Sequence, residues 1–285
     1  MEKSDKLLID VTKNSTDYNL VRMNSKKLTF CSDPYVLCDF AEYTKLADTK
    51  EIMTTLTNAM IRINDLVHLY EFYFLMSERN AQNFDYALVE DIIKKSKNAK
   101  IMSYCLSFTN VLDKVGMLES LYATKNAKWI ERLGEEMDTS ALPGYKEALD
   151  EAIYSPYFPP CLEKYQTKDI SNLVELAIKE RNPYIINELA DYMEYLMTYR
   201  GVSGLNVNEL VTPYKWAVVG NPLYQYEFAA SVDTIEKTSF TTMVIEEGIA
   251  KIMYYMYEYV KGVDKLLLKS AINQTENEKY IKLVQ

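Results

Sequence analysis

Histidine is almost missing from this chain, which has a single one, His68, in 285 residues. Because a serine or cysteine nucleophile most often needs a histidine as its base, the composition argues against hydrolases of that type. The helical spacing around His68 groups it with Asp65 and Glu71 on the polar side of a predicted helix. We therefore expect His68 at the surface, without a catalytic role.

Cysteine, glycine and proline are also scarce. The four cysteines show neither the paired spacing of a structural zinc site nor that of a disulfide scaffold, so we expect reduced thiols and no bound metal. Eight glycines and eight prolines supply few turns, which disfavours a many-stranded fold and favours helices. The glycine-rich signatures of nucleotide-phosphate loops do not occur, so we predict no cofactor.

Long apolar runs are missing as well. No stretch reaches the roughly 18 apolar residues of a membrane-spanning helix. Residues 1–15 also lack the apolar core of a signal peptide. We therefore expect a cytoplasmic protein that does not enter a membrane.

Basic charge is in deficit, with 32 Lys and Arg against 41 Asp and Glu and a net charge of −9. Since duplex binding depends on neutralising phosphates, we do not expect either half of the chain to grip a duplex by itself. Local basic clusters remain, one of them beside a tryptophan, and cations with aromatic rings are the groups that bind single strands. A solvated surface explains the same residues. The candidate nucleic-acid contacts are Arg22, Lys26, Lys27, Lys94, Lys95, Lys97, Lys100, Lys125, Lys128, Trp129 and Arg132.

The first 47 residues contain short runs of strand-forming residues. Asn-Ser pairs and the tripeptide 32–34, Ser-Asp-Pro, separate these runs as turn formers. We predict a small antiparallel β element here, with strands at 7–11, 18–23, 27–30 and 35–40.

From residue 48 onward the apolar spacing is helical. Asn182-Pro183 and Asn221-Pro222 each combine an N-cap residue with proline at the first helical position. The segments that they begin, 182–190 and 221–229, match at four of nine positions, which indicates either a helical repeat of about 40 residues or reuse of the same cap chemistry. The predicted helices include 49–78, one starting near Asp85, 101–122, 125–137, one capped by Asp169 or Ser171, one stopped by Gly201, and 241–270.

Three prolines gather in the segment 154–160, YSPYFPP, where they fix φ and remove backbone donors. We interpret this segment as a rigid hinge and Cys161 as a small buried residue at the start of the next helix. The predicted fold is mainly α, a multi-helix bundle with a small N-terminal antiparallel β element. Its parts are a β-hairpin element at 1–47, a helical half at 48–153, the hinge at 154–161 and a C-terminal helical bundle at 162–285.

The tetrapeptide 158–161, Phe-Pro-Pro-Cys, with the helices predicted after it, resembles the start of the iron–sulfur domain of archaeal and eukaryotic primase large subunits. The resemblance extends to about residue 210, and its specific motif is four residues long. In that family three further cluster cysteines follow the first, whereas no cysteine follows Cys161 here. The resemblance therefore implies a relative without an iron–sulfur cluster.

The segment 241–270 is rich in tyrosine and methionine, and its apolar and aromatic surface extends nearly all the way round. A helix of this kind either occupies a central position in its bundle or packs against a partner as well as its own core. We predict a non-catalytic binding or assembly subunit of a larger intracellular complex, with protein partners and with nucleic acid as a further candidate. The alternatives are a nucleoprotein subunit similar to a CRISPR effector large subunit or an archaeal viral protein, the cluster-less primase relative, and an enzyme with a metal-dependent site. The candidate interface residues are Tyr254, Tyr255, Tyr257 and Tyr259.

Overall fold

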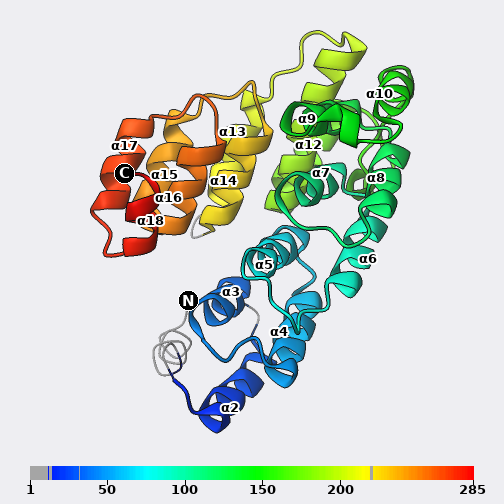
Figure 1. Ribbon diagram of the computed structural model, residues 1–285. Helices are drawn as coiled ribbons and strands as arrows, with labels where there is room; N and C mark the ends of the chain where they lie inside the picture. The colour runs from blue at the N-terminus through cyan, green and yellow to red at the C-terminus, as the bar shows by residue number, and fades with distance from the viewer. Residues whose placement is uncertain (1–11, 13–14, 32, 219–220) are drawn as a thin grey trace. The chain divides into compact units, whose positions relative to one another are not determined.

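A computed structural model describes residues 12, 15–31, 33–218 and 221–285 of the chain (Figure 1). In these residues the secondary structure is helical, with no strand, so the prediction of a mainly α fold is confirmed. The chain divides into two compact units, the first ending at Tyr157 and the second beginning at Phe158. None of the helices in the described segments has the length and apolar character that crossing a bilayer requires.

The first unit is built from pairs of helices that follow one another along the chain. The first helices of successive pairs form one layer, in which α2 packs on α4, α6 on α8 and α8 on α10. The second helices form the other layer, in which α3 packs on α5, α5 on α7 and α7 on α9. The elements are α2 (Tyr18–Leu28), α3 (Pro34–Tyr43), α4 (Lys50–Ile63), α5 (Leu66–Glu78), α6 (Tyr86–Ser96), α7 (Ala99–Phe108), α8 (Lys114–Ala123), α9 (Ala127–Glu136), the short 3-10 helix η1 (Thr139–Ala141) and α10 (Tyr145–Tyr154).

The second unit repeats this plan. The first helices α11 and α13 contact each other, as do α15 and α17, while α12, α14, α16 and α18 pack in sequence as the second helices. Each pair thus buries its apolar face against its neighbours, which is the arrangement of an α-solenoid. The elements are the 3-10 helix η2 (Pro160–Tyr165), α11 (Ile170–Glu180), α12 (Pro183–Arg200), α13 (Asn208–Ala217), α14 (Pro222–Ser231), α15 (Thr238–Glu247), α16 (Ala250–Tyr259), α17 (Lys265–Asn273) and α18 (Glu278–Leu283).

A common cap register underlies the pairs. In four of them the N-caps of the first and second helices lie thirteen residues apart, at 85 and 98, 113 and 126, 169 and 182, and 264 and 277. The second-helix caps at 98 and 126 are separated by 28 residues, and those at 221, 249 and 277 have the same spacing. This interval is shorter than the repeats of about 33 and 34 residues in ankyrin and tetratricopeptide proteins.

In five of the pairs the turn contains one residue in the left-handed region directly before the second-helix cap. Its φ lies between 53° and 69° at Asn64, Lys97, Lys125, Arg181 and Gly248. A left-handed residue ends the first helix and redirects the chain, and the next residue starts the second helix. At Asp65, Asn98, Asn126 and Asn182 a side-chain oxygen accepts backbone N–H groups of the new helix.

The predicted N-terminal β element is wrong for the residues that the structure describes. Residues 18–23 lie in α2, 27–30 form the end of α2 and the turn after it, and 35–40 lie in α3. Asp17 and Asp33 explain the difference, because the Asp17 carboxylate accepts two backbone N–H groups and the Asp33 carboxylate one at the start of a helix. Pro34, taken as part of a turn, occupies the first helical position. The predicted strand at 7–11 lies outside the described residues.

Several predicted helices are split. The helix predicted at 49–78 is α4 and α5, because Asn64 is left-handed and Asp65 caps α5. The helix predicted at 241–270 is divided among α15, α16 and α17, with Gly248 and Gly262 at positive φ. His68, expected at the surface, is buried in α5, with its ring edge-on to Tyr35 at 4.9 Å between centroids.

The proline-rich segment lies at the boundary of the two units. Pro160 begins η2, and Cys161 in that helix is half-buried, although the sequence analysis expected it to be buried. Phe158 packs edge-on against Tyr192 of α12 at 5.3 Å, and the Lys168 ammonium lies 5.3 Å from the Phe158 ring. Of the motif that resembles primase, Phe158 therefore contributes to packing in the second unit.

Candidate binding pocket between two loops

A pocket of about 300 Å³ opens in the first unit between the loop that joins α5 to α6 and the loop that joins α7 to α8. Both loops connect the second helix of one pair to the first helix of the next, so they are equivalent in the helix-pair plan. The volume is at the lower end of the range of about 300–1,000 Å³ that is typical of ligand sites. The lining residues are Ser77, Asn80, Ala81, Gln82, Tyr86, Asn110 and Leu112.

The α5–α6 loop is held in place by Asp48. One carboxylate oxygen accepts the backbone N–H of Gln82 at 3.0 Å and the other accepts that of Asn83 at 3.1 Å, while the Asn83 amide donates to the Asp48 carbonyl at 2.7 Å. Asn80 is left-handed, at φ 49°, and Ala81 N–H bonds back to the Met76 carbonyl. The first wall of the pocket is therefore fixed by hydrogen bonds to its backbone.

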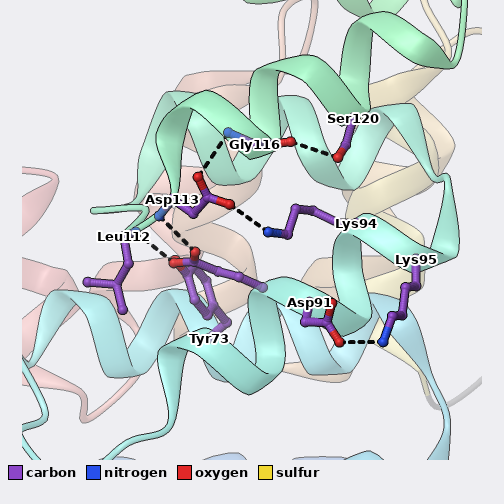
Figure 2. A network of polar contacts seen from close by, with 9 residues as sticks. Tyr73, Asp91, Lys94, Lys95, Leu112, Asp113, Gly116 and Ser120 are labelled. Carbon is purple, nitrogen blue, oxygen red and sulfur yellow. Dashed lines mark hydrogen bonds and ion pairs between the residues drawn. The ribbon is translucent and has the colours of Figure 1, made fainter.

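The α7–α8 loop is held by Glu90 of α6, whose side chain is 1% exposed. One of its carboxylate oxygens accepts the Tyr73 hydroxyl at 2.7 Å and the Leu112 N–H at 2.8 Å, and the other accepts the Asp113 N–H at 3.1 Å. Figure 2 shows Tyr73, Leu112 and Asp113 gathered at the start of α8. Burial and the bond to Glu90 raise the pKa of the Tyr73 hydroxyl, so it stays a neutral donor.

Two further sets of contacts hold the start of α8 and join the two loops. The Asp113 carboxylate caps α8 through the Gly116 N–H and pairs with the Lys94 ammonium at 2.7 Å (Figure 2). The bond from Lys94 and the Gly116 amide lower the pKa of Asp113, and Asp113 in turn raises the pKa of Lys94. The Asn110 N–H donates to the Ser77 hydroxyl at 3.1 Å, which joins the second loop to the first.

Leu112 presents an exposed apolar side chain at the rim of the pocket on this fixed backbone. Leu112 is 68% exposed, and Val115, three residues later in α8, is 62% exposed. Exposed apolar side chains that gather in one patch mark sites of protein interaction. The pocket thus combines an apolar rim with neutral amide and hydroxyl groups, and no ionisable carboxylate, ammonium or guanidinium lines it.

Sequence reasoning did not single out these residues. Asn80 and Asn110 follow the ends of α5 and α7, where an asparagine is easily read as a turn former alone. Leu112 and Val115 fit an apolar helical stripe. The one available signal was the position of Asn80, Asn110 and Leu112 between the ends of α5 and α7 and the first-helix caps at 85 and 113, which are 28 residues apart.

The basic residues of the sequence analysis are dispersed over the first unit, and acidic partners engage at least five of them. Arg22 pairs with Glu51 at 2.6 Å and Lys26 lies 3.6 Å from the same carboxylate. Lys94 and Lys95 pair with Asp113 and Asp91. Lys125 pairs with Glu151 at 2.6 Å. Lys27 and Lys97 are exposed, and Lys97 is the left-handed residue after α6.

The cluster around Trp129 lies largely inside the protein. Trp129 is buried and packs edge-on against Tyr104 at 5.4 Å. Lys128 and Arg132 place their charges 5.5 and 5.3 Å from its ring, and both Lys100 and Lys128 are buried. A ring in this position is not available to stack on a base.

The four tyrosines of the predicted interface lie on α16. Tyr255 is buried and packs between Tyr226 at 5.5 Å and Tyr259 at 6.0 Å. Tyr254 faces Tyr280 of α18 at 5.6 Å, and the Lys265 ammonium lies 5.1 Å from the Tyr257 ring. The tyrosines thus pack largely against their own unit, with Tyr259 the most exposed of them.

Within the described segments there is no group of three or more His, Cys, Asp or Glu side chains arranged to hold a metal ion. The same segments contain four free cysteines. Comparison of the whole chain with protein-family models, with curated proteins and with solved structures gives no match.

Proposed function

We propose that this chain is a non-catalytic scaffold that acts in the cytoplasm and binds another protein through the pocket between the α5–α6 and α7–α8 loops. The observation that carries the proposal is the exposed Leu112, held on a backbone that a buried carboxylate fixes, at the rim of a neutral pocket. A solenoid of helix pairs supports it, because such folds present the loops of successive repeats side by side as a binding surface.

Nucleic acid is less well supported as the partner. Most of the basic residues expected to contact it are engaged by carboxylates or buried, Lys27 and Lys97 being exposed, and the tryptophan beside them belongs to the core. An electrostatic site for phosphates needs cations that are free to approach the strand.

The test is purification of the tagged chain from its native source at native abundance, followed by identification of bound proteins. Three forms are compared: wild type, Leu112→Asp and Leu266→Asp. Leu266 is the matched control, because it is 82% exposed and lies on α17 in the other unit. We expect one protein to co-purify in a fixed ratio with wild type and Leu266→Asp, and to fall at least tenfold with Leu112→Asp. A chain that purifies alone in all three forms, or a partner equally retained by both variants, would overturn the proposal.

A further inference from the structure

We infer, on the basis of the proposed function, that the pocket takes an extended, uncharged segment of the partner polypeptide with one apolar side chain seated at Leu112. The inference concerns the chemistry of the occupant, and three features of the pocket support it: its amides, its size and its lack of charge.

The amides come from both walls. Asn80 and Gln82 lie on the first loop and Asn110 on the second. The Gln82 side-chain nitrogen donates to the Asn80 backbone carbonyl at 2.9 Å, and the Gln82 side-chain oxygen remains as an acceptor. In the part of the chain that the structure describes, no hydrogen bond engages the side-chain amide of Asn80 or of Asn110. Each carboxamide offers a donor and an acceptor together, which is the combination that a peptide main chain presents along its length.

The volume and the apolar surface determine what side chain enters. A pocket of about 300 Å³ is too small for a folded element and large enough for one or two side chains. Ala81 is buried at the pocket and Leu112 stands at its rim. The Tyr86 hydroxyl donates to the Met76 carbonyl at 2.7 Å, so it is already engaged inside the protein. An aliphatic or aromatic anchor therefore fits better than a polar one.

The lack of charge in the lining disfavours charged occupants. The lining contains no ion that would balance a carboxylate, a phosphate or an ammonium group. A charged side chain seated there would meet amide and hydroxyl groups but no opposite charge, so it would gain no ion pair for the hydration that it gives up. A phosphopeptide, an acidic or basic segment and a nucleic-acid strand are thus disfavoured, and a neutral polypeptide segment remains.

Both walls are rigid before the partner arrives. Asp48 and Glu90 hold the two loops through their backbone N–H groups, and Ser77 joins one loop to the other. When a segment binds here, only the segment loses conformational freedom, because the two loops are already ordered. Preorganisation of this kind increases affinity by lowering the entropy lost on binding.

The experiment selects peptides from a phage-displayed library of random twelve-residue sequences on the full chain. The immobilised forms are wild type, Leu112→Asp, Asn110→Ala and the control Leu266→Asp. Asn110→Ala removes the amide but leaves the backbone N–H that bonds Ser77, and circular dichroism checks that every variant folds. A synthetic peptide with the enriched sequence is then titrated by fluorescence anisotropy.

We expect enrichment of neutral sequences with one large apolar position. Their dissociation constant should rise at least tenfold with Leu112→Asp and about fivefold with Asn110→Ala, and stay within twofold with Leu266→Asp. Enrichment of charged sequences, or no enrichment on a wild-type chain that does co-purify a partner, would overturn this inference and leave the scaffold function standing. Absence of both a co-purifying partner and selected peptides would overturn both.

Discussion

The carboxylate of Glu90 is the group on which the second wall of the pocket depends, and replacing it with glutamine gives a quantitative test. The carboxylate accepts three hydrogen bonds, two at one oxygen and one at the other. Glutamine has one carbonyl oxygen, so it can replace the first oxygen but turns a donor toward the Asp113 N–H. Hydrogen bonds to charged groups contribute about 1.5–3 kcal/mol each. Glu90→Gln loses one of these hydrogen bonds and weakens the other two by removing the charge. We therefore expect the free energy of opening the α7–α8 loop to fall by about 3 kcal/mol.

The assay is hydrogen exchange of individual amides, because it reports opening of the loop separately from unfolding of either unit. A cost of about 3 kcal/mol corresponds to an increase of about a hundredfold in opening, since about 1.4 kcal/mol is tenfold. We expect the Leu112 and Asp113 amides of Glu90→Gln to lose about that much protection. Tyr73→Phe removes one donor and leaves both amide bonds, so its effect on the same amides should be at most tenfold.

Glu194 supplies the matched control. This buried carboxylate in the second unit accepts the Asp233 N–H at 3.1 Å and the Thr234 N–H at 2.7 Å. Glu194→Gln should therefore accelerate exchange at 233 and 234 and leave 112 and 113 unchanged. The reasoning is refuted if Glu90→Gln lowers protection equally throughout the first unit while 112 and 113 show no additional loss, because Glu90 would then stabilise the core as a whole and not the loop.

Two further changes test the helix-pair plan. Lys97 lies at φ 55°, where a residue with a side chain is less stable by about 1–2 kcal/mol than in its preferred regions. Lys97→Gly should therefore raise the midpoint of thermal unfolding, whereas Lys95→Gly inside α6 should lower it. A lower midpoint for both variants would contradict the role assigned to Lys97. The pKa of Glu180 is lowered by Lys164 and then by Tyr165, so its stabilisation is complete above the unfolded pKa of about 4.3 and is lost as the pH falls through the lower folded value. Urea unfolding between pH 5 and 3 should show a shallower loss of stability in Glu180→Gln than in wild type, and parallel curves would refute this.

The cap chemistry was the most predictable part of the fold. Asn182-Pro183 and Asn221-Pro222 begin helices, Asp169 caps α11 and Gly201 ends α12 in the left-handed region. These signals are local, because one side chain bonds the backbone two or three residues away. The same physics explains the wrong β element, since Asp17 and Asp33 act as caps in a segment whose apolar runs are too short to show a helical period.

The pocket was not predictable in the same way. The backbone of Leu112 is held by Glu90, 22 residues earlier, and Asn80 and Asn110 line one pocket because successive helix pairs pack together. Burial of His68 likewise depends on a neighbouring helix, since its ring packs against Tyr35 of α3. The matching segments at 182 and 221 were recognised, but their separation of 39 residues includes the long α12 and concealed the 28-residue spacing of the other caps.

The left-handed junction between paired helices has a consequence for how such a chain diverges. The position is held by asparagine, lysine, arginine and glycine in different pairs, and the cap after it by aspartate, asparagine and isoleucine. What recurs is the left-handed backbone conformation, which many residue types can adopt at a modest cost in conformational free energy. A descendant of the same ancestor can therefore exchange almost every side chain and keep the fold, provided that the spacing of its turns survives. Relatives of a protein with this fold should therefore share the spacing of the turns more than the identity of the residues.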